Sequence, residues 1–198
     1  MESEKIAGKM NENNVTSASD ELANLKRISD VENFVKVDFD DLRICTAGEE
    51  HVKEIAELWA NLASVQQISA PERYNFKAEG KDWQAFVRRK LAKKHNLLLV
   101  IHKTGSMEVR GFLYLQTIVI PSSDLVLKGV IEEVYTKPQY RKQGIGSKLL
   151  EVALEWASSQ NIKQIDFVTL ANTKGVADFY FKFLKSFKTN LNLELLTM

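Results

Sequence analysis

The chain contains 198 residues, of which 44% are hydrophobic, and its 27 basic and 26 acidic side chains leave a formal net charge of +1. This length supports one domain with a substantial core and is short for two. The balanced charge provides no global field for nucleic acid or an anionic membrane, so we expect neither as a partner.

No feature of the sequence directs the chain to a membrane or to an oxidising compartment. Its single cysteine, Cys45, excludes an internal disulfide. It has no run of about 18 apolar residues that could span a bilayer, and its first residues lack the apolar segment of a secretory signal. We therefore expect a cytoplasmic protein. The oligomeric state stays open, with a homodimer as one option.

The first part of the chain differs in composition from the rest. Residues 1–35 are rich in Asn, Ser, Thr and acidic side chains and contain few large apolar groups. Such a segment buries too little apolar surface to offset the entropy lost on ordering. We predict a flexible polar tail over residues 1–35 and a single domain over residues 36–198.

Apolar periodicity predicts a mixed α/β domain in the order strand, two helices, three strands, helix, strand, helix, strand. The first strand covers residues 42–45, and the two helices cover 49–65, with Trp59 in the core, and 81–94. The second helix has a basic side, which we interpret as a solvated face. The alternative is a site for the adenosine 3′-phosphate or an acidic partner. This side consists of Arg88, Arg89, Lys90, Lys93 and Lys94.

The remaining elements follow in quick succession. A hairpin is predicted from strands 97–101 and 111–119, joined at a turn that contains Gly105. The later predicted elements are a strand over 129–136, a helix over 144–159, a strand over 164–169, a helix over 175–184 and a strand over 187–196.

The most informative segment joins the strand 129–136 to the helix 144–159. Its loop reads Arg141, Lys142, Gln143, Gly144, Ile145 and Gly146, followed by Ser147. Glycine lets consecutive main-chain amides approach one anion, and the start of a helix adds unpaired amides and the positive end of its dipole. Basic side chains add positive charge nearby. We interpret the loop as a cradle for the pyrophosphate of a nucleotide-like cofactor.

Two commoner glycine motifs do not fit this loop. A P-loop requires lysine followed by Ser or Thr, whereas Ser147 precedes Lys148 here. A dinucleotide fingerprint requires a third small residue, where this chain has Leu149. The pattern that remains is Arg-x-x-Gly-x-Gly.

This pattern resembles the acetyl-coenzyme A loop of the GNAT superfamily of N-acetyltransferases, which reads Gln or Arg-x-x-Gly-x-Gly or Ala. The segment from Val130 to Arg141 is similar to the strand and loop of its small-amine branch, which includes the spermidine/spermine acetyltransferases. The resemblance covers roughly Leu42 to the C-terminus. It implies an α/β (α+β) fold with a mixed, mostly antiparallel central sheet, flanked by helices and splayed at the fourth strand.

The resemblance also implies acetyl-coenzyme A as the acyl donor. In the family, the splayed strand offers the amide at the position of Val134 to the acetyl oxygen and that of Thr136 to the pantetheine arm. Asn172 either hydrogen-bonds the pantetheine or caps a helix. The residues implied to contact acetyl-coenzyme A are Val134, Tyr135, Thr136, Arg141, Lys142, Gln143, Gly144, Ile145, Gly146, Ser147 and Asn172.

Acetyl transfer also requires an uncharged amine, and neutralising a lysine-like amine of pKa about 10.4 costs roughly 4 to 5 kcal/mol at pH 7. The family's glutamate falls on Glu132, the candidate general base, with Glu133 as the second choice. For either one the alternative is a carboxylate paired with Lys or Arg. Period-2 alternation would place them on opposite faces of the strand, with one facing the cleft.

Tyr180 matches the tyrosine that in this family protonates the departing thiolate, although the segment from Asn172 has one residue more than the family pattern. The alternative is an aromatic side chain packed against the cofactor or the core. The three histidines and Cys45 lack metal-ligand spacing, so we expect no metal.

Together these observations predict an N-acetyltransferase that transfers an acetyl group from acetyl-coenzyme A to a primary amine by direct attack in a ternary complex. We expect the acceptor to be a small-molecule amine. A protein N-terminus or lysine is the alternative acceptor, and a module that senses acetyl-coenzyme A without turnover is the alternative from another class.

Overall fold

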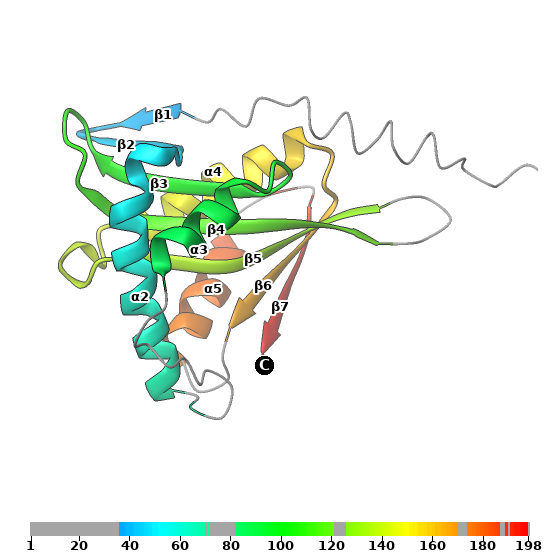
Figure 1. Cartoon of the computed structure of the whole chain (residues 1–198). Coiled ribbons are helices and arrows are strands. Elements are labelled where there is room, and N and C mark those ends of the chain that lie inside the picture. Colours follow the sequence, from blue (N-terminus) through cyan, green and yellow to red (C-terminus); the bar gives the residue numbers. More distant parts are fainter. Residues whose placement is uncertain are drawn as a thin grey trace, which may run out of the picture.

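The computed structural model describes residues 36–69, 71, 82–120, 126–169, 174–186, 189 and 191–197, and the predicted tail lies outside these. In the described part, seven strands form one sheet in sequential order, antiparallel from the first to the fifth and parallel thereafter (Figure 1). The strands are β1 (Lys36–Phe39), β2 (Leu42–Thr46), β3 (Leu97–Lys103), β4 (Val109–Ile120), β5 (Val126–Thr136), β6 (Gln164–Thr169) and β7 (Asn192–Thr197).

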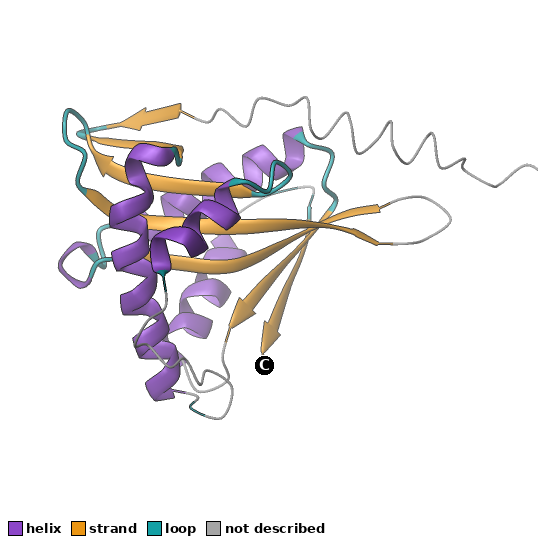
Figure 2. Ribbon diagram, viewed as in Figure 1, coloured by secondary structure: helices purple, strands orange, loops and turns teal. Residues whose placement is uncertain are grey.

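Helices cover both faces of the sheet (Figure 2). One face carries α2 (Val52–Ser69) and α3 (Trp83–Leu91), and the other carries α4 (Ile145–Ser159) and α5 (Lys174–Ser186). Short 3-10 turns, η1 (Glu49–His51) and η2 (Pro138–Tyr140), precede α2 and α4. Among the helices that the structure describes, none combines the length and hydropathy needed to cross a membrane.

The alternation of β4 explains why its sequence is an almost continuous apolar run. Phe112 and Tyr114 belong to the core cluster under α2 and α3, whereas Leu113 and Leu115 belong to the cluster under α4. A strand covered on both faces has no polar side to alternate with. The predicted mixed, mostly antiparallel sheet flanked by helices is therefore confirmed, and Trp59 lies in the core as predicted, 4% exposed.

Two differences concern the beginning of the domain. Strand β1 was not predicted, because its four residues form too short a run for a clear periodic signal, and three of its side chains, Lys36, Val37 and Asp38, are exposed. Helix α3 is shorter than predicted: the Asp82 side chain accepts a hydrogen bond from the Ala85 amide at 2.9 Å and begins the helix as its N-cap.

Strand β5 separates from β6 halfway along its length. Their pairing ends at Ile131 and Phe167, and Figure 1 shows β6 and β7 fanning away from β5 toward their C-terminal ends. At the same place, the register of β5 with β4 shifts, so that Glu132 is the extra residue of a β-bulge between Ile131 and Glu133. The second half of β5 therefore has one edge that faces a gap in the sheet.

Candidate active site

A cavity of ≈ 910 Å³ lies where the second half of β5 meets the N-terminus of α4, helix α5 and the end of α2. It brings together nine of the residues predicted to contact acetyl-coenzyme A, together with Tyr180. These nine are Val134, Tyr135, Thr136, Arg141, Lys142, Gly144, Ile145, Gly146 and Ser147.

The other two predicted contact residues are Gln143 and Asn172. Gln143 is exposed outside the lining and donates from its side-chain amide to the Gln139 carbonyl at 3.2 Å. Asn172 lies outside the described residues. The rest of the loop motif is contiguous in sequence, which is why a sequence pattern could identify it.

The main-chain groups of β5 are oriented by its pairing with β4. The Lys137 amide donates to the Arg110 carbonyl at 2.9 Å. Since antiparallel ladders alternate in direction, the amides of Val134 and Thr136 face away from β4, toward the gap beside β6. The Thr136 carbonyl points the same way and accepts from Nε of Arg141 at 3.1 Å.

The loop of residues 141–147, which we call the phosphate loop, turns twice through left-handed backbone conformations. Lys142 has φ 61° and Gly144 has φ 79°, and Gly144 is the N-cap of α4. Loops of this kind at a helix N-terminus present several amides to one anion. A Cβ on Gly146 would lie 3.2 Å from Cζ of Phe179, so this glycine also permits the close approach of α4 and α5.

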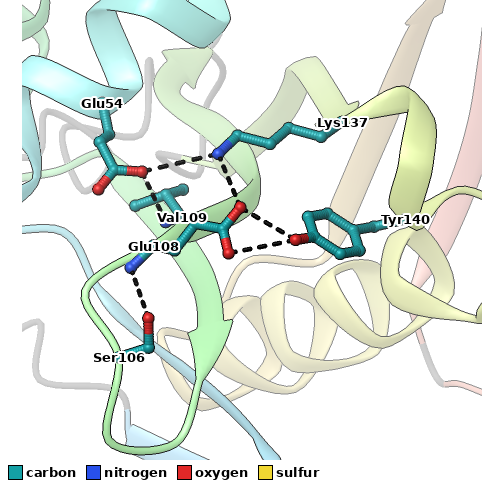
Figure 3. Close-up of polar contacts among 6 residues, drawn as sticks. All are labelled: Glu54, Ser106, Glu108, Val109, Lys137 and Tyr140. Atoms are coloured by element: carbon teal, nitrogen blue, oxygen red, sulfur yellow. Dashed lines mark hydrogen bonds and ion pairs between the residues drawn. The ribbon is translucent and has the colours of Figure 1, made fainter.

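A polar network holds η2 against the start of β4 (Figure 3). The Tyr140 hydroxyl donates to the carboxylate of Glu108, at 3.0 and 3.1 Å from its two oxygens. Nζ of Lys137 lies 3.4 Å from Glu108 and 3.7 Å from Glu54 of α2, and the Arg110 guanidinium stacks over the Tyr140 ring at 4.5 Å. The hydrogen bond from Tyr140 lowers the pKa of Glu108. The network anchors the segment that leads into the phosphate loop.

Strand alternation predicted that Glu132 and Glu133 lie on opposite faces of the sheet, but both lie on the same face. Glu132 accepts from Nζ of Lys90 on α3 at 2.9 Å, and Glu133 accepts from the Gln66 side-chain amide on α2 at 3.1 and 3.2 Å. Both helices cover the same face of the sheet. The prediction is wrong because the bulge at Glu132 interrupts the period of two, which then resumes at Glu133 opposite Tyr114.

Lys90 departs from the solvated face that was predicted for α3. Its side chain is 17% exposed and its ammonium lies 4.2 Å from the centre of the Tyr114 ring, with the rings of Trp59 and Phe86 at 5.9 and 5.6 Å. Aromatic faces and the Glu132 carboxylate together stabilise a cation at this position. Glu132 is therefore paired with Lys90, which matches the alternative given above of a carboxylate paired with Lys or Arg.

The Glu133 carboxyl has an environment suited to proton transfer near neutral pH. Burial raises the pKa of Glu133 to about 7, and the charge of Glu132 adds to this, against the lowering effects of the Gln66 hydrogen bond and the Lys90 charge. Neither glutamate is among the described residues that line the cavity. Gln66, the partner of Glu133, directly follows the lining residue Val65 on α2. Perturbed carboxyl groups beside a cleft are candidates for general bases.

Tyr180 lies in the wall of the cavity and is 2% exposed. Its ring packs against Phe167 and Phe179 at 5.2 and 5.4 Å. Burial, and after it the charge of Glu133, raises the pKa of Tyr180 well above its ordinary value. The phenol is therefore protonated at neutral pH and able to donate.

The residues that sequence reasoning missed come from the helices of the other face. Leu62 and Val65 of α2 line the cavity, while Gln66 and Lys90 bond to the two glutamates. An amphipathic pattern shows that α2 and α3 pack on the sheet, but not which strand residue each side chain meets. No local signal could have indicated these pairs.

Comparison with known proteins agrees with the predicted family and fold. Residues 59–184 match the model of the acetyltransferase (GNAT) family, so the chain belongs to that family. A thialysine N-epsilon-acetyltransferase from Bos taurus is 38% identical over 50 residues, 25% of this chain and 29% of that relative. The chain thus matches less than a third of that protein's length.

Solved structures show the same fold at low sequence identity. A transcriptional regulator from Bacillus halodurans C-125 superposes with a TM-score of 0.58 at 22% identity, over 75% of this chain and 93% of that chain. A glucosamine-6-phosphate N-acetyltransferase from Arabidopsis thaliana gives a TM-score of 0.56 at 16% identity, over 76% and 95% of the two chains. These likenesses concern the fold alone.

Proposed function

We propose that the protein transfers an acetyl group from acetyl-coenzyme A to the primary amine of a small molecule, by direct attack within a ternary complex. The observation that carries this proposal is the convergence on one cavity of the phosphate loop, the open edge of β5 and Tyr180, with a carboxyl of pKa about 7 beside it. Family membership supports the acyl donor.

The donor's diphosphate binds the phosphate loop, where the main-chain amides before and at the start of α4 supply the hydrogen bonds. Arg141 and Lys142 add positive charge at the mouth of the cavity. The Thr136 amide bonds the pantetheine arm, and the Val134 amide bonds the thioester oxygen. Negative charge develops on that oxygen as the amine attacks, so a fixed donor there stabilises the transition state.

Glu133 is the general base, in place of Glu132 that the family motif indicated. Glu132 is engaged by Lys90, and the environment of Glu133 brings its pKa close to working pH. Glu133 takes a proton from the acceptor ammonium, directly or through one water. Glu132 and Lys90 act on the pKa of Glu133 and are positioning residues in this scheme.

Tyr180 is the general acid. When the carbon–sulfur bond breaks, the electron pair stays on sulfur and the phenol gives its proton to the thiolate, which leaves as free coenzyme A. Glu133 releases the first proton to solvent before the attack and then takes the second proton from the attacking nitrogen. This second proton returns through water to the Tyr180 phenolate, which restores the acid. Each turnover therefore converts one acetyl-coenzyme A and one ammonium into one amide, one thiol and one proton released to solvent.

The acceptor side favours a small cation. Glu133 directly precedes the lining residue Val134 and can accept a proton from an ammonium, and the short curated match is to an enzyme named for thialysine, an amine-bearing amino acid. Apolar side chains of Leu62 and Val65 form one wall and suit the methylene groups of an alkyl amine.

A panel of acceptors tests the proposal. Purified full-length protein is given acetyl-coenzyme A with polyamines, amino-sugars, thialysine, lysine, and peptides with free N-termini or lysine side chains, and thiol release is measured. The proposal predicts release that depends on a small amine. Release with peptides alone would assign a protein acceptor, and binding of acetyl-coenzyme A without release by any amine would contradict catalysis.

A further inference from the structure

Three side chains able to bind a metal lie at the end of α2 that is remote from the cavity. They are Cys45 of β2, His51 of η1 and His102 of β3. The cavity residue Val65 stands 14 positions after His51 in the chain. Since a helix rises 1.5 Å per residue, the two lie about 20 Å apart along α2. The cluster is thus separate from the acetyl transfer site.

The fold assembles the cluster from positions that are distant in sequence. In the β2–β3 ladder, Arg43 pairs with His102 and Cys45 pairs with Val100, so Cys45 and His102 are diagonal neighbours on one face. Both belong to the face that α2 and α3 cover, and η1 places His51 over them. His51 and His102 are 4% and 7% exposed.

The distances suit a single small cation. One ligand atom from each residue lies within 4.8 Å of the others, and Sγ of Cys45 is 3.7 Å from Nε2 of His102. Ligands of a tetrahedral Zn²⁺, bound at 2.0 to 2.3 Å, lie about 3.3 to 3.8 Å from one another. Inward shifts of less than about 1 Å would close the set around a metal.

The ring of His102 is already oriented for binding. Its Nδ1 lies 3.1 Å from the Lys103 carbonyl, which accepts a hydrogen bond only if Nδ1 carries the proton. Nε2 then presents its lone pair toward Cys45. Metal-binding histidines typically donate their second nitrogen to such an acceptor, which fixes the tautomer.

The turn that carries His51 also carries a carboxylate, Glu50. Nδ1 of His51 accepts from the Gly48 amide at 3.0 Å and lies 3.3 Å from Oε1 of Glu50. The Glu50 side chain is 59% exposed, so it can turn inward at little cost. A cation bound through this nitrogen would replace the Gly48 hydrogen bond.

We propose that Cys45, His51 and His102 bind a divalent cation of the zinc class, with the Glu50 carboxylate or a water as the fourth ligand. One thiolate and two imidazoles are a donor set for Zn²⁺ rather than for Mg²⁺ or Ca²⁺, which prefer oxygen. The bound metal ties η1 and the start of α2 to β2 and β3. Its role is structural, and the proposal is independent of the acetyl transfer proposed above.

Cobalt substitution tests the site. The full-length chain, without a histidine tag and treated with a chelator, is titrated with Co²⁺ and monitored by absorption. Because Cys45 is the chain's one cysteine, a thiolate-to-cobalt charge-transfer band reports this residue alone. We expect a band that saturates at one equivalent, with the intense visible bands of tetrahedral cobalt, and displacement by one equivalent of Zn²⁺.

Variants separate this site from surface binding. Cys45→Ser should abolish the charge-transfer band. Cys45→Ser and His102→Gln should each lower the affinity for Zn²⁺ by about 100-fold or more, since even outer-shell partners of a metal contribute 10- to 100-fold to its affinity. His95→Gln, at a histidine outside the cluster, is the matched control and should bind as the unchanged protein does. Zn²⁺ should raise the Tm of the unchanged protein but not of Cys45→Ser.

Two results would overturn the site. One is a folded, unchanged protein that shows no thiolate band at stoichiometric Co²⁺ and no rise in Tm with Zn²⁺. The other is a set of variants that all retain the affinity of the unchanged protein for Zn²⁺. Both readouts are independent of acetyl transfer, so a failure here leaves the proposed activity untouched.

Discussion

Replacing Glu133 by glutamine tests the assignment of the general base. The substitution keeps the size of the side chain and its contact with Gln66 but removes the group that accepts the proton. A lysine-like amine of pKa about 10.4 is neutral in about 1 molecule in 2500 at pH 7. Without an acceptor in the site, the variant must rely on that fraction, which sets an upper limit to its defect.

The raised pKa of Glu133 determines how far the base can help. Moving a proton from such an amine to a carboxyl of pKa about 7 costs about 5 kcal/mol, whereas an ordinary glutamate of pKa 4.5 would make the transfer cost about 8 kcal/mol. The burial that raises the pKa of Glu133 therefore lowers the cost of the transfer by about 3 kcal/mol. We expect kcat/KM at pH 7 to fall by about 100- to 2500-fold in Glu133→Gln.

The assay is thiol release from acetyl-coenzyme A with the best acceptor, followed from pH 6 to pH 10. The unchanged protein should lose activity below pH about 7, where Glu133 is protonated. In Glu133→Gln the rate should rise about tenfold per pH unit toward the acceptor's pKa, so the two proteins converge at high pH. An unaltered profile in Glu133→Gln, or the same loss in Glu132→Gln instead, would refute the assignment.

Three further predictions follow from the same site. Glu132→Gln removes a negative charge that raises the pKa of Glu133, so the acid limb of the kcat/KM profile should move to lower pH. Lys90→Gln removes a positive charge that lowers this pKa, so the limb should move to higher pH. Acid limbs that shift in the same direction, or do not shift, would contradict the influence of these two charges on Glu133. The folded-state pKa of Glu133 is raised from 4.5 to about 7, so the folded protein binds more protons than the unfolded chain in this range, and its free energy of unfolding should fall by about 3 kcal/mol between pH 4.5 and 7. Urea titrations should show that Glu133→Gln lacks this fall. The same dependence of the unfolding free energy on pH in both proteins would exclude it. Tyr180→Phe keeps the packing on Phe167 and Phe179 and should lower kcat at pH 7 by about 100-fold with KM nearly unchanged, a defect that shrinks as pH approaches the thiol pKa; full activity at pH 7 would remove Tyr180 as the acid.

The phosphate loop could be predicted because its parts are contiguous. A strand, Arg141, two glycines and an amphipathic helix follow one another in sequence, and the geometry depends mainly on local backbone preferences such as the positive φ of Gly144. Apart from β1, the order of strands and helices along the chain followed from periodicity for the same reason.

The orientation of the two glutamates could not be predicted, because a single extra residue in β5 changes the face of every side chain that follows it. That bulge is set by the register of β5 against β4, which involves Leu115 and Tyr114. The ion pair of Lys90 with Glu132 depends in turn on how α3 lies on the sheet.

The cluster of Cys45, His51 and His102 shows the same limit. Its spacing in sequence matches no metal motif, and the residues meet only through the pairing of β2 with β3 and the turn into α2. Interactions set by register between distant segments are invisible to local patterns, whatever the strength of the individual propensities.

Calorimetry of coenzyme A binding tests the central claim, that the phosphate loop holds the donor. Gly144→Glu and Gly105→Glu form a matched pair: both glycines have positive φ, 79° and 77°, and a Cβ at either meets no atom within 4 Å. Each variant should lose about 1 to 2 kcal/mol of stability from backbone strain. Only Gly144 borders the cavity, where the new carboxylate would repel the diphosphate.

We predict that the unchanged protein and Gly105→Glu bind one equivalent of coenzyme A and that folded Gly144→Glu binds none. Coenzyme A binding by Gly144→Glu with the affinity of Gly105→Glu, or no binding by the folded, unchanged protein, would contradict the account.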